Sequence, residues 1–226
     1  MIKHITHPLR MSFGFLLLFA GCHKDLTGPE ADYIGSGRIV SESRSLGTFK
    51  AISIESVGNV HFRQDSERSV RVEADDNILD RVSTRVENGL LSIGLLPGSY
   101  SHVTVDLYVS APTLEVITIS GAGSISCAAP LHLDSLRCLV SGAGSMTLSG
   151  SSVRQTILIS GAGSVYSNEM VSSICSVTIS GTGSAEVNVT QQLDAMVSGV
   201  GNVLYSGNPP VVHQQVSGIG NVIRRP

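Results

Sequence analysis

Six copies of a short glycine motif, spaced at nearly equal intervals, dominate the second half of the chain. Each copy reads Ser-Gly-x-Gly followed by Ser or Asn, and Ile or Val precedes it. The first serines are Ser120, Ser141, Ser160, Ser180, Ser198 and Ser217, so the copies start 21, 19, 20, 18 and 19 residues apart. A period near 20 residues predicts a solenoid in which each repeat forms one coil.

Apolar and polar residues alternate on both sides of each motif, as Ile157 and Ile159 do before the third copy and Val165 does after it. Alternation with a period of two indicates short strands with one buried face. A coil of this length has no room for a helix as well as two strands and their turns. The sequence therefore predicts an all-β fold, a parallel β-helix with coils of about 20 residues that pair with the coils above and below.

The glycines of the motifs are expected to form the corners between strands. Glycine suits a corner because it reaches positive φ and lets neighbouring coils approach closely. The corner residues are Gly121, Gly123, Gly142, Gly144, Gly161, Gly163, Gly181, Gly183, Gly199, Gly201, Gly218 and Gly220. The polar residue after each second glycine is expected to stack into a ladder: Ser124, Ser145, Ser164, Ser184, Asn202 and Asn221. Between corners, Ser151 and Ser152 are expected on a loop.

The first half carries the same pattern with weaker repetition. Residues 56–60 read as a diverged corner, and residues 75–82 are expected to hold a single helical turn. Asn88-Gly89 is typical of a tight turn between two strands, and residues 103–109 alternate clearly. We interpret residues 35–226 as one continuous solenoid domain.

The N-terminus has the features of an export signal. Two basic residues precede a short apolar run at 13–20, and Phe-Ala-Gly then leads to Cys22. This resembles a bacterial lipobox, which makes residues 1–21 a lipoprotein signal peptide, Cys22 the lipidated residue and residues 22–34 a tether. A transmembrane anchor needs about 20 apolar residues, more than this run offers. A plain secretory signal with an accidental cysteine is the remaining alternative.

Composition excludes several classes of protein. The chain is 42% hydrophobic with 15% charged residues, which is not the composition of a disordered chain. Its net charge is −3, and cutting after residue 21 removes two bases, leaving 13 basic and 18 acidic residues, or −5. This balance gives no electrostatic footprint for nucleic acid. Three cysteines remain after Cys22, at spacings that match no zinc site, and are expected to be small buried residues.

Catalysis has little support in the sequence. A glycosidase needs paired carboxylates and a lyase needs a base near a cation. Residues 116–223 contain only six charged residues, which fall at different offsets from their motifs and so do not cluster: Asp134, Arg137, Arg154, Glu169, Glu186 and Asp194. The Gly-x-Gly motifs lack the third glycine of a dinucleotide fingerprint, and the loops lack the Asp of calcium-binding repeats. The sequence predicts no enzyme activity, cofactor or metal.

One mixed-charge region is the candidate binding surface. Acidic residues at 73–76 lie among several arginines, and the set comprises Glu73, Asp75, Asp76, Arg63, Arg71 and Arg81. The acidic run is also the one candidate ion site, and its plainer interpretation is a solvated loop that caps a helical turn.

A family resemblance rests on a combination of short segments. They are Gly35-Ser36-Gly37, FKAISI at 49–54, VGNV at 57–60, VEADDNIL at 72–79 and NGLLSI at 88–93, followed by the glycine motifs. Together they resemble the bacterial head GIN domain of the auto-transporter adhesin family. The resemblance implies a right-handed β-helix in a lipoprotein or secreted protein, and it implies no settled activity. Three of the six motifs read Gly-Ala-Gly-Ser and a fourth reads Gly-Thr-Gly-Ser, a departure from Gly-x-Gly-Asn.

These observations predict a lipid-anchored protein of the cell envelope, most simply at the outer membrane. Its acyl chains on Cys22 would contact the membrane, and its Ser-, Thr- and Asn-rich solenoid would bind a surface glycan or an envelope protein without catalysis. A structural or signalling component with a dedicated protein partner is the alternative. A polysaccharide-processing enzyme is a third possibility, since β-helices host such enzymes.

Overall fold

The protein was analysed as a computed structural model, which describes residues 32–225. Strands make up almost all of this range. The elements are β1 (Asp32–Ile34), β2 (Ile39–Ser43), β3 (Ala51–Ile54), β4 (Asn59–Gln64), β5 (Ser69–Asp75), the 3-10 turn η1 (Leu79–Arg81), β6 (Val82–Glu87), β7 (Leu90–Leu95), β8 (Ser99–Ser101), β9 (Val105–Ala111), β10 (Val116–Ile119), β11 (Ser124–Cys127), β12 (Leu131–Val140), β13 (Ser145–Ile159), β14 (Ser164–Ile179), β15 (Thr182–Val197), β16 (Val200–Ser206), β17 (Val211–Val216) and β18 (Ile219–Arg224).

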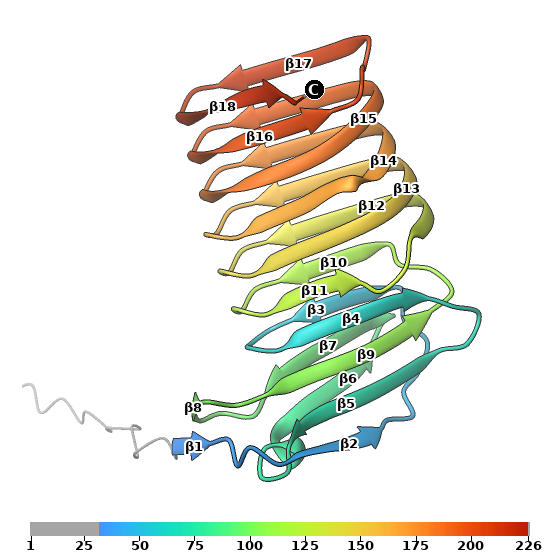
Figure 1. Cartoon of the computed structure of the whole chain (residues 1–226), viewed down its shortest axis with the longest axis vertical. Helices are drawn as coiled ribbons and strands as arrows, with labels where there is room; N and C mark the ends of the chain where they lie inside the picture. The colour runs from blue at the N-terminus through green and yellow to red at the C-terminus, as the bar shows by residue number, and fades with distance from the viewer. Residues whose placement is uncertain (1–31, 226) are drawn as a thin grey trace, which may run out of the picture. The chain divides into compact units, whose positions relative to one another are not determined.

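Strands β10 to β18 form a stack of coils (Figure 1). On one face β10, β12, β13, β14, β15 and β17 pair in that order, and on the other face β11, β13, β14, β15, β16 and β18 do so. The long strands β13, β14 and β15 bend from one face to the other, so they belong to both. Every one of these pairs is parallel. The predicted all-β parallel β-helix is therefore confirmed.

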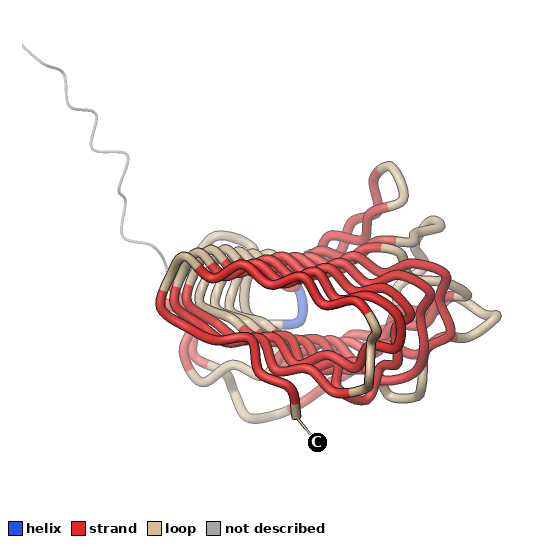
Figure 2. The backbone as a smooth tube through the Cα atoms, turned by 90° about the horizontal axis from the view of Figure 1, so that it is seen from above, coloured by secondary structure: helices blue, strands red, loops and turns tan. Residues whose placement is uncertain are grey.

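The glycine corners lie above one another along one side of the coils, as the view along the stack shows (Figure 2). Backbone hydrogen bonds join successive corners, for example from Ser141 N to Ile119 O at 2.9 Å. A Cβ built on Gly142 would lie 2.0 Å from the carbonyl oxygen of Gly121, and one on Gly144 would lie 2.6 Å from Ile119 Cγ2. Close approach of neighbouring coils thus requires glycine at both positions of the motif.

Positive φ, the other reason expected for glycine, does not apply to the twelve motif glycines. Among the described residues the glycines with positive φ are Gly37, Gly58, Gly89, Gly98, Gly150 and Gly207. Of these only Gly58, with φ at 138°, lies in a corner, the diverged one at 56–60. The sequence analysis was wrong on this point because a coil corner can turn with ordinary φ values when no side chain separates it from the next coil.

The interior of the coils is a column of aliphatic side chains. Residues three and one before the first serine of each motif point inward, and Ile157 and Ile159 are 1% and 0% exposed. In the last coil the equivalent residues Gln214 and Val216 are exposed, because no described strand lies beyond β17. Cys138 and Cys175 belong to the same column and are buried, whereas Cys127 is half-buried.

A small polar group interrupts this apolar column. Gln155 is 0% exposed and lies within 3.3 to 3.8 Å of Ser172, Ser167, Met170 and Cys175. Ser152 is also buried, and its Oγ lies 2.8 Å from that of Ser172. The expected loop around Ser152 is therefore wrong. β13 continues through this position, and the side chain of Ser152 lies on the buried face of the strand.

The polar ladder after the corners runs in register along the stack. Ser124, Ser145, Ser164, Ser184, Asn202 and Asn221 are successive partners on adjacent strands. Beyond Ser124 the ladder continues to Asn59 on β4 and then to Asp106 on β9. Asn59 accepts a hydrogen bond from Ser124 Oγ at 2.8 Å and donates one to Asp106 at 3.1 Å.

The first third of the described chain differs from the regular coils. β3, β4, β7 and β9 extend the stack in parallel, but β2 pairs with β5, β5 with β9 and β6 with β7 in antiparallel fashion. The turn at Asn88 and Gly89, with φ of 50° and 79°, joins β6 to β7. It is too short for a crossover between parallel strands, so these two strands pair antiparallel. The 3-10 turn η1 lies at this end, with Ile78 buried beside it. These elements cover the N-terminal end of the core.

Candidate functional site

A cleft of about 700 Å³ lies over β4, β9 and β5, beside the end of β2. Basic residues, residues with hydroxyl groups and small apolar residues line it, and none of the described residues in the lining is acidic. They are Ser43, Arg44, Ser45, His61, Arg63, Arg68, Ser69, Val70, Arg71, Tyr108, Val109, Ser110 and Ala128. Pockets that hold small ligands usually have volumes of about 300 to 1,000 Å³.

Strand alternation places the functional side chains on the outer surface. Val70 and Val109 are buried, so their neighbours Arg71 and Tyr108 point outward. Arg71 is the register partner of Tyr108, and Tyr108 is in turn the partner of His61. Three neighbouring strands thus bring three residues far apart in sequence into one row.

This row is a stack of planar groups. The guanidinium carbon of Arg71 lies 4.2 Å from the ring centroid of Tyr108, and the rings of Tyr108 and His61 stack with centroids 4.9 Å apart. His61 also lies 3.2 Å from Asp106 through Nε2 and 3.2 Å from Ser126 through Nδ1. Contacts on both ring nitrogens fix the orientation of the imidazole, and the stack fixes the tyrosine.

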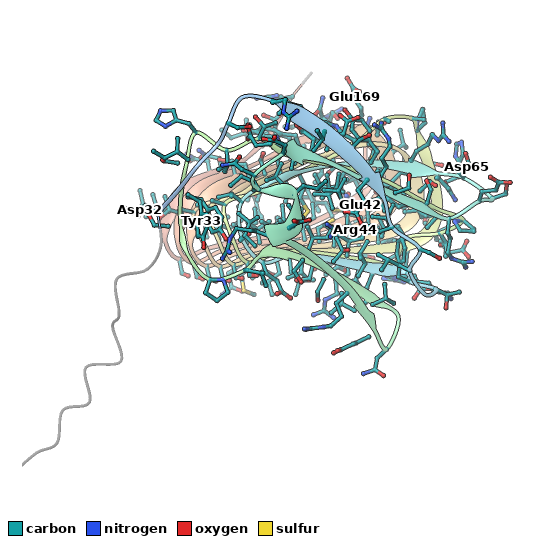
Figure 3. All side chains as sticks on the ribbon, turned by 90° about the horizontal axis from the view of Figure 1, so that it is seen from below. Asp32, Tyr33, Glu42, Arg44, Asp65 and Glu169 are labelled. Atoms are coloured by element: carbon teal, nitrogen blue, oxygen red, sulfur yellow. The ribbon has the colours of Figure 1, made fainter. Side chains whose placement is uncertain are left out.

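The four arginines of the cleft have different surroundings. Arg44 donates to the carbonyl oxygens of Val82 and Leu79 and pairs with Glu42 at 3.2 Å, so its guanidinium is held in place by the protein (Figure 3). Its side chain is only 14% exposed. Arg44 thus contributes charge to the cleft rather than free donors.

Arg63 and Arg71 each contact one carboxylate beside the cleft. Arg63 pairs with Asp65 at 2.8 Å, and Arg71 pairs with Glu73. The backbone N–H of Glu67 and the nearby Arg63 lower the pKa of Asp65, which therefore stays charged. Arg68 is exposed and has no acidic partner among residues 32–225. Of the four arginines that line the cleft, it is the one without a carboxylate partner in the described range.

The six residues of the predicted binding surface lie in three separate places. Arg63 and Arg71 line the cleft, and Glu73 lies beside it. Asp75 is 1% exposed, and its carboxylate accepts hydrogen bonds from the backbone N–H groups of Gly37 at 2.6 Å and Thr104 at 2.7 Å. Because these bonds engage both oxygens of Asp75, the acidic run does not present this carboxylate to an ion or partner.

Asp76 and Arg81 both bind the segment that precedes β2. Asp76 accepts from the hydroxyl of Ser36 and pairs with Arg38, and these hydrogen bonds lower its pKa. Arg81 lies 3.8 Å from the ring centroid of Tyr33 and donates to Tyr100 Oη at 2.8 Å. The rings of Tyr33 and Tyr100 stack, which holds β1 against β8.

Sequence reasoning missed Arg44, His61 and Tyr108. The available signal was the alternation around them, since the buried residues Val60 and Phe62 flank His61 and place it outward. The pairing of β9 between β4 and β5 was not readable from spacing, because one of the two pairs is parallel and the other antiparallel.

Further searches of the described residues give limited results. No group of three or more His, Cys, Asp or Glu side chains in this range is placed to hold a metal ion. No helix in the same range is long and apolar enough to span a bilayer. Cys22 and the expected signal peptide lie outside the described residues.

The stacked coils make this chain a β-solenoid protein. Within that class, residues 48–209 match the family described as "Putative auto-transporter adhesin, head GIN domain". The chain belongs to this family, which confirms the resemblance noted in the sequence. A search of curated proteins finds no match.

Solved structures share the fold at low sequence identity. A putative adhesin from Bacteroides fragilis is 19% identical with a TM-score of 0.72, and the match covers 85% of this chain and 100% of that one. A putative adhesin from Parabacteroides distasonis is 22% identical with a TM-score of 0.58, covering 86% and 100%. A protein of the same organism described as a putative lipid binding protein is 19% identical with a TM-score of 0.51, covering 85% and 99%.

Proposed function

We propose that this chain is a non-catalytic binding module of the cell envelope whose binding site is the basic cleft over β4, β9 and β5. The observation that supports it most is the lining of that cleft, which combines four arginines with hydroxyl groups and contains no acidic residue in the described range. Such a lining suits recognition of a ligand by hydrogen bonds and charge. Membership of an adhesin family is in keeping with a binding role.

One arrangement beside the cleft, which shares His61 with it, resembles a catalytic site. Asp106, His61 and Ser126 form a continuous hydrogen-bonded row, as the acid, base and nucleophile of a hydrolase would. Ser126, however, lies inside β11 and is paired with β4 on one side and β13 on the other. The backbone N–H groups around it belong to the sheet, so no oxyanion hole adjoins the hydroxyl. We therefore favour binding over hydrolysis.

Anchoring of the module through Cys22 is the second part of the proposal. The apolar run before Cys22 is shorter than the roughly 20 residues that a membrane span requires. More than one acyl chain gives stable anchoring, which the diacylglyceryl and amide-linked chains of a lipoprotein provide. Cys22→Ser should move the protein from the membrane fraction to the soluble fraction. Retention of that variant in membranes, with unchanged processing, would contradict the anchor.

A glycan array and a membrane pull-down test the binding role together. We expect the full chain, purified in detergent, to bind a subset of glycans on the array. Recovery of one stoichiometric protein partner without any glycan binding would favour the alternative, a structural or signalling component of the envelope. Hydrolysis of ester or glycoside substrates that Ser126→Ala abolishes would contradict the non-catalytic proposal.

A further inference from the structure

We infer that the cleft over β4, β9 and β5 recognises an acidic sugar, a glycan unit that carries a carboxylate or a phosphate. This inference rests on the proposed binding function and names the chemistry of its ligand. It is supported by the distribution of charge, by the free hydroxyl groups and by the size of the cleft.

Charge is the first argument. Arg68 has no acidic partner in residues 32–225, and Arg63 and Arg71 each contact a single carboxylate at the edge of the cleft. A guanidinium carries five N–H donors, so one carboxylate partner leaves donors free for a second anion. Arginine binds carboxylate and phosphate groups through two parallel hydrogen bonds. The cleft therefore favours an oxyanion over a neutral or cationic group.

Hydroxyl groups are the second argument. Ser110 Oγ donates to the carbonyl oxygen of Glu67 at 2.8 Å, so in the 2.8 Å contact between Ser69 and Ser110 the donor is Ser69. The lone pairs of Ser69 Oγ then remain available to accept from a ligand. Ser43 and Ser45, at the end of β2 beside β5, are exposed and also line the cleft. Acceptors and donors of this kind complement the hydroxyl groups of a sugar ring.

Size is the third argument. The cleft of about 700 Å³ has room for a small oligosaccharide unit. More of the lining surface is apolar than polar, and Tyr108, Val70, Val109 and Ala128 contribute to the apolar part. The choice of a sugar over a lipid therefore rests on the charge and the hydroxyl groups of the lining.

The experiment compares acidic sugars with a neutral sugar and with a free anion. Isothermal titration of the full chain in detergent would use digalacturonate, galactose 6-phosphate and uncharged galactobiose, with inorganic phosphate as a fourth ligand. We expect one of the two acidic sugars to bind with a Kd of about 10 µM to 1 mM, more weakly as salt rises, and galactobiose at least about tenfold more weakly. The acidic sugar that binds identifies the anion.

Variants locate the binding in the cleft. Arg68→Ala and Arg71→Ala should each weaken binding of the acidic sugar by about tenfold, as expected for loss of a charge-assisted hydrogen bond. Arg71→Lys keeps the charge but loses the planar fork, and it should recover only part of the affinity. Arg154→Ala is the matched control, because Arg154 is an exposed arginine on β13 outside the cleft. Thermal unfolding of each variant confirms that it folds.

Three results would overturn the inference. They are equal binding of galactobiose, binding of inorganic phosphate as tight as that of the sugar phosphate, and binding of anionic phospholipid vesicles that depends on Arg68 while neither acidic sugar binds. Glycan binding on the array that survives Arg68→Ala and Arg71→Ala would contradict this inference and the assignment of the cleft as the binding site, and would leave only the general role of a non-catalytic binding module. Absence of any glycan ligand would remove both.

Discussion

The carbonyl oxygen of Gly142 lies 2.1 Å from the point that a Cβ on Gly161 would occupy. The contact joins the corners of two neighbouring coils, and the same approach recurs between Gly161 and Gly181 at 2.1 Å. A backbone atom cannot swing aside as a flexible side chain does. The spacing of the coils along this side of the solenoid is therefore set by glycine.

Gly161→Ala should consequently destabilise the solenoid by about 1 to 3 kcal/mol, because the added methyl group pushes two coils apart. Gly94→Ala is the matched control. Gly94 lies inside β7 rather than in a corner, its φ is not in the left-handed region, and the nearest atom to its Cβ position is 3.7 Å away. Its replacement should change stability by no more than about 0.5 kcal/mol. Chemical denaturation compares the two, and equal tolerance would contradict the close packing of the corners.

The buried amide of Gln155 gives a prediction with an unexpected sign. Its contacts with Ser172 and Ser167 are long, at 3.3 and 3.4 Å, and its other partners are the weakly polar sulfur atoms of Met170 and Cys175. These contacts therefore compensate poorly for burial of the amide. Both serines have a second and shorter partner, Ser152 for Ser172 and the carbonyl oxygen of Glu186 for Ser167. Gln155→Leu should therefore be neutral or stabilise the protein by up to about 1 kcal/mol.

Gln155→Ala tests the same site in the opposite direction. It removes the amide as well, but it leaves a cavity in the column, and it should cost about 2 kcal/mol or more. A Gln155→Leu variant that unfolds as easily as Gln155→Ala would show that the amide stabilises the core. Thermal unfolding midpoints measure the difference.

The three thiols should be slow to react in the folded protein. Burial raises the pKa of Cys127 to about 11 and that of Cys175 to about 12, and burial raises the pKa of Cys138 as well. The thiolate is the reactive form, so Ellman's reagent at pH 8 should label the native protein slowly and the unfolded protein fast. Half-buried Cys127 should react first. Rapid labelling of Cys138 in the native state would contradict its position in the core.

The same pKa shifts predict a loss of stability in alkali. A thiol whose pKa is higher in the folded state than its ordinary value of 9.0 binds its proton more tightly when folded. Stability is therefore intact below pH 9.0 and falls as the pH rises through about 11. Cys175→Ala removes one of these thiols, so the free energy of unfolding should fall less steeply as the pH rises above 9.0.

The repeats made most of the fold predictable from the sequence. Ile157 and Ile159 could be placed in the core from alternation alone, and the ladder from Ser124 to Asn221 followed from the spacing of the motifs. The irregular N-terminal strands had no repeat to align them, so the antiparallel pairing of β5 with β9 could not be read. Arg63 and Arg71 were singled out by local charge, but the contact of Arg71 with Tyr108 depends on that pairing.

The acidic run at 73–76 shows why charge alone misleads. Sequence suggested an exposed loop, yet Asp75 is buried, and its oxygens accept the N–H groups of Gly37 and Thr104. Asp75 is the last residue of β5, and it fastens two neighbouring segments of backbone to that strand end. Calcium at millimolar concentration should therefore leave the unfolding midpoint unchanged.

Asp75→Asn is the sharpest test of this role. The amide oxygen can still accept from one backbone N–H, but the NH₂ group faces the other N–H donor, which loses its partner. Such a loss costs about 1 to 3 kcal/mol, more when the acceptor was charged, so we expect a destabilisation of at least about 2 kcal/mol. Asp80→Asn is the control, because it makes the same chemical change at an exposed carboxylate, in η1. If both variants unfold at the same denaturant concentration, the carboxylate of Asp75 does not hold these backbone segments together.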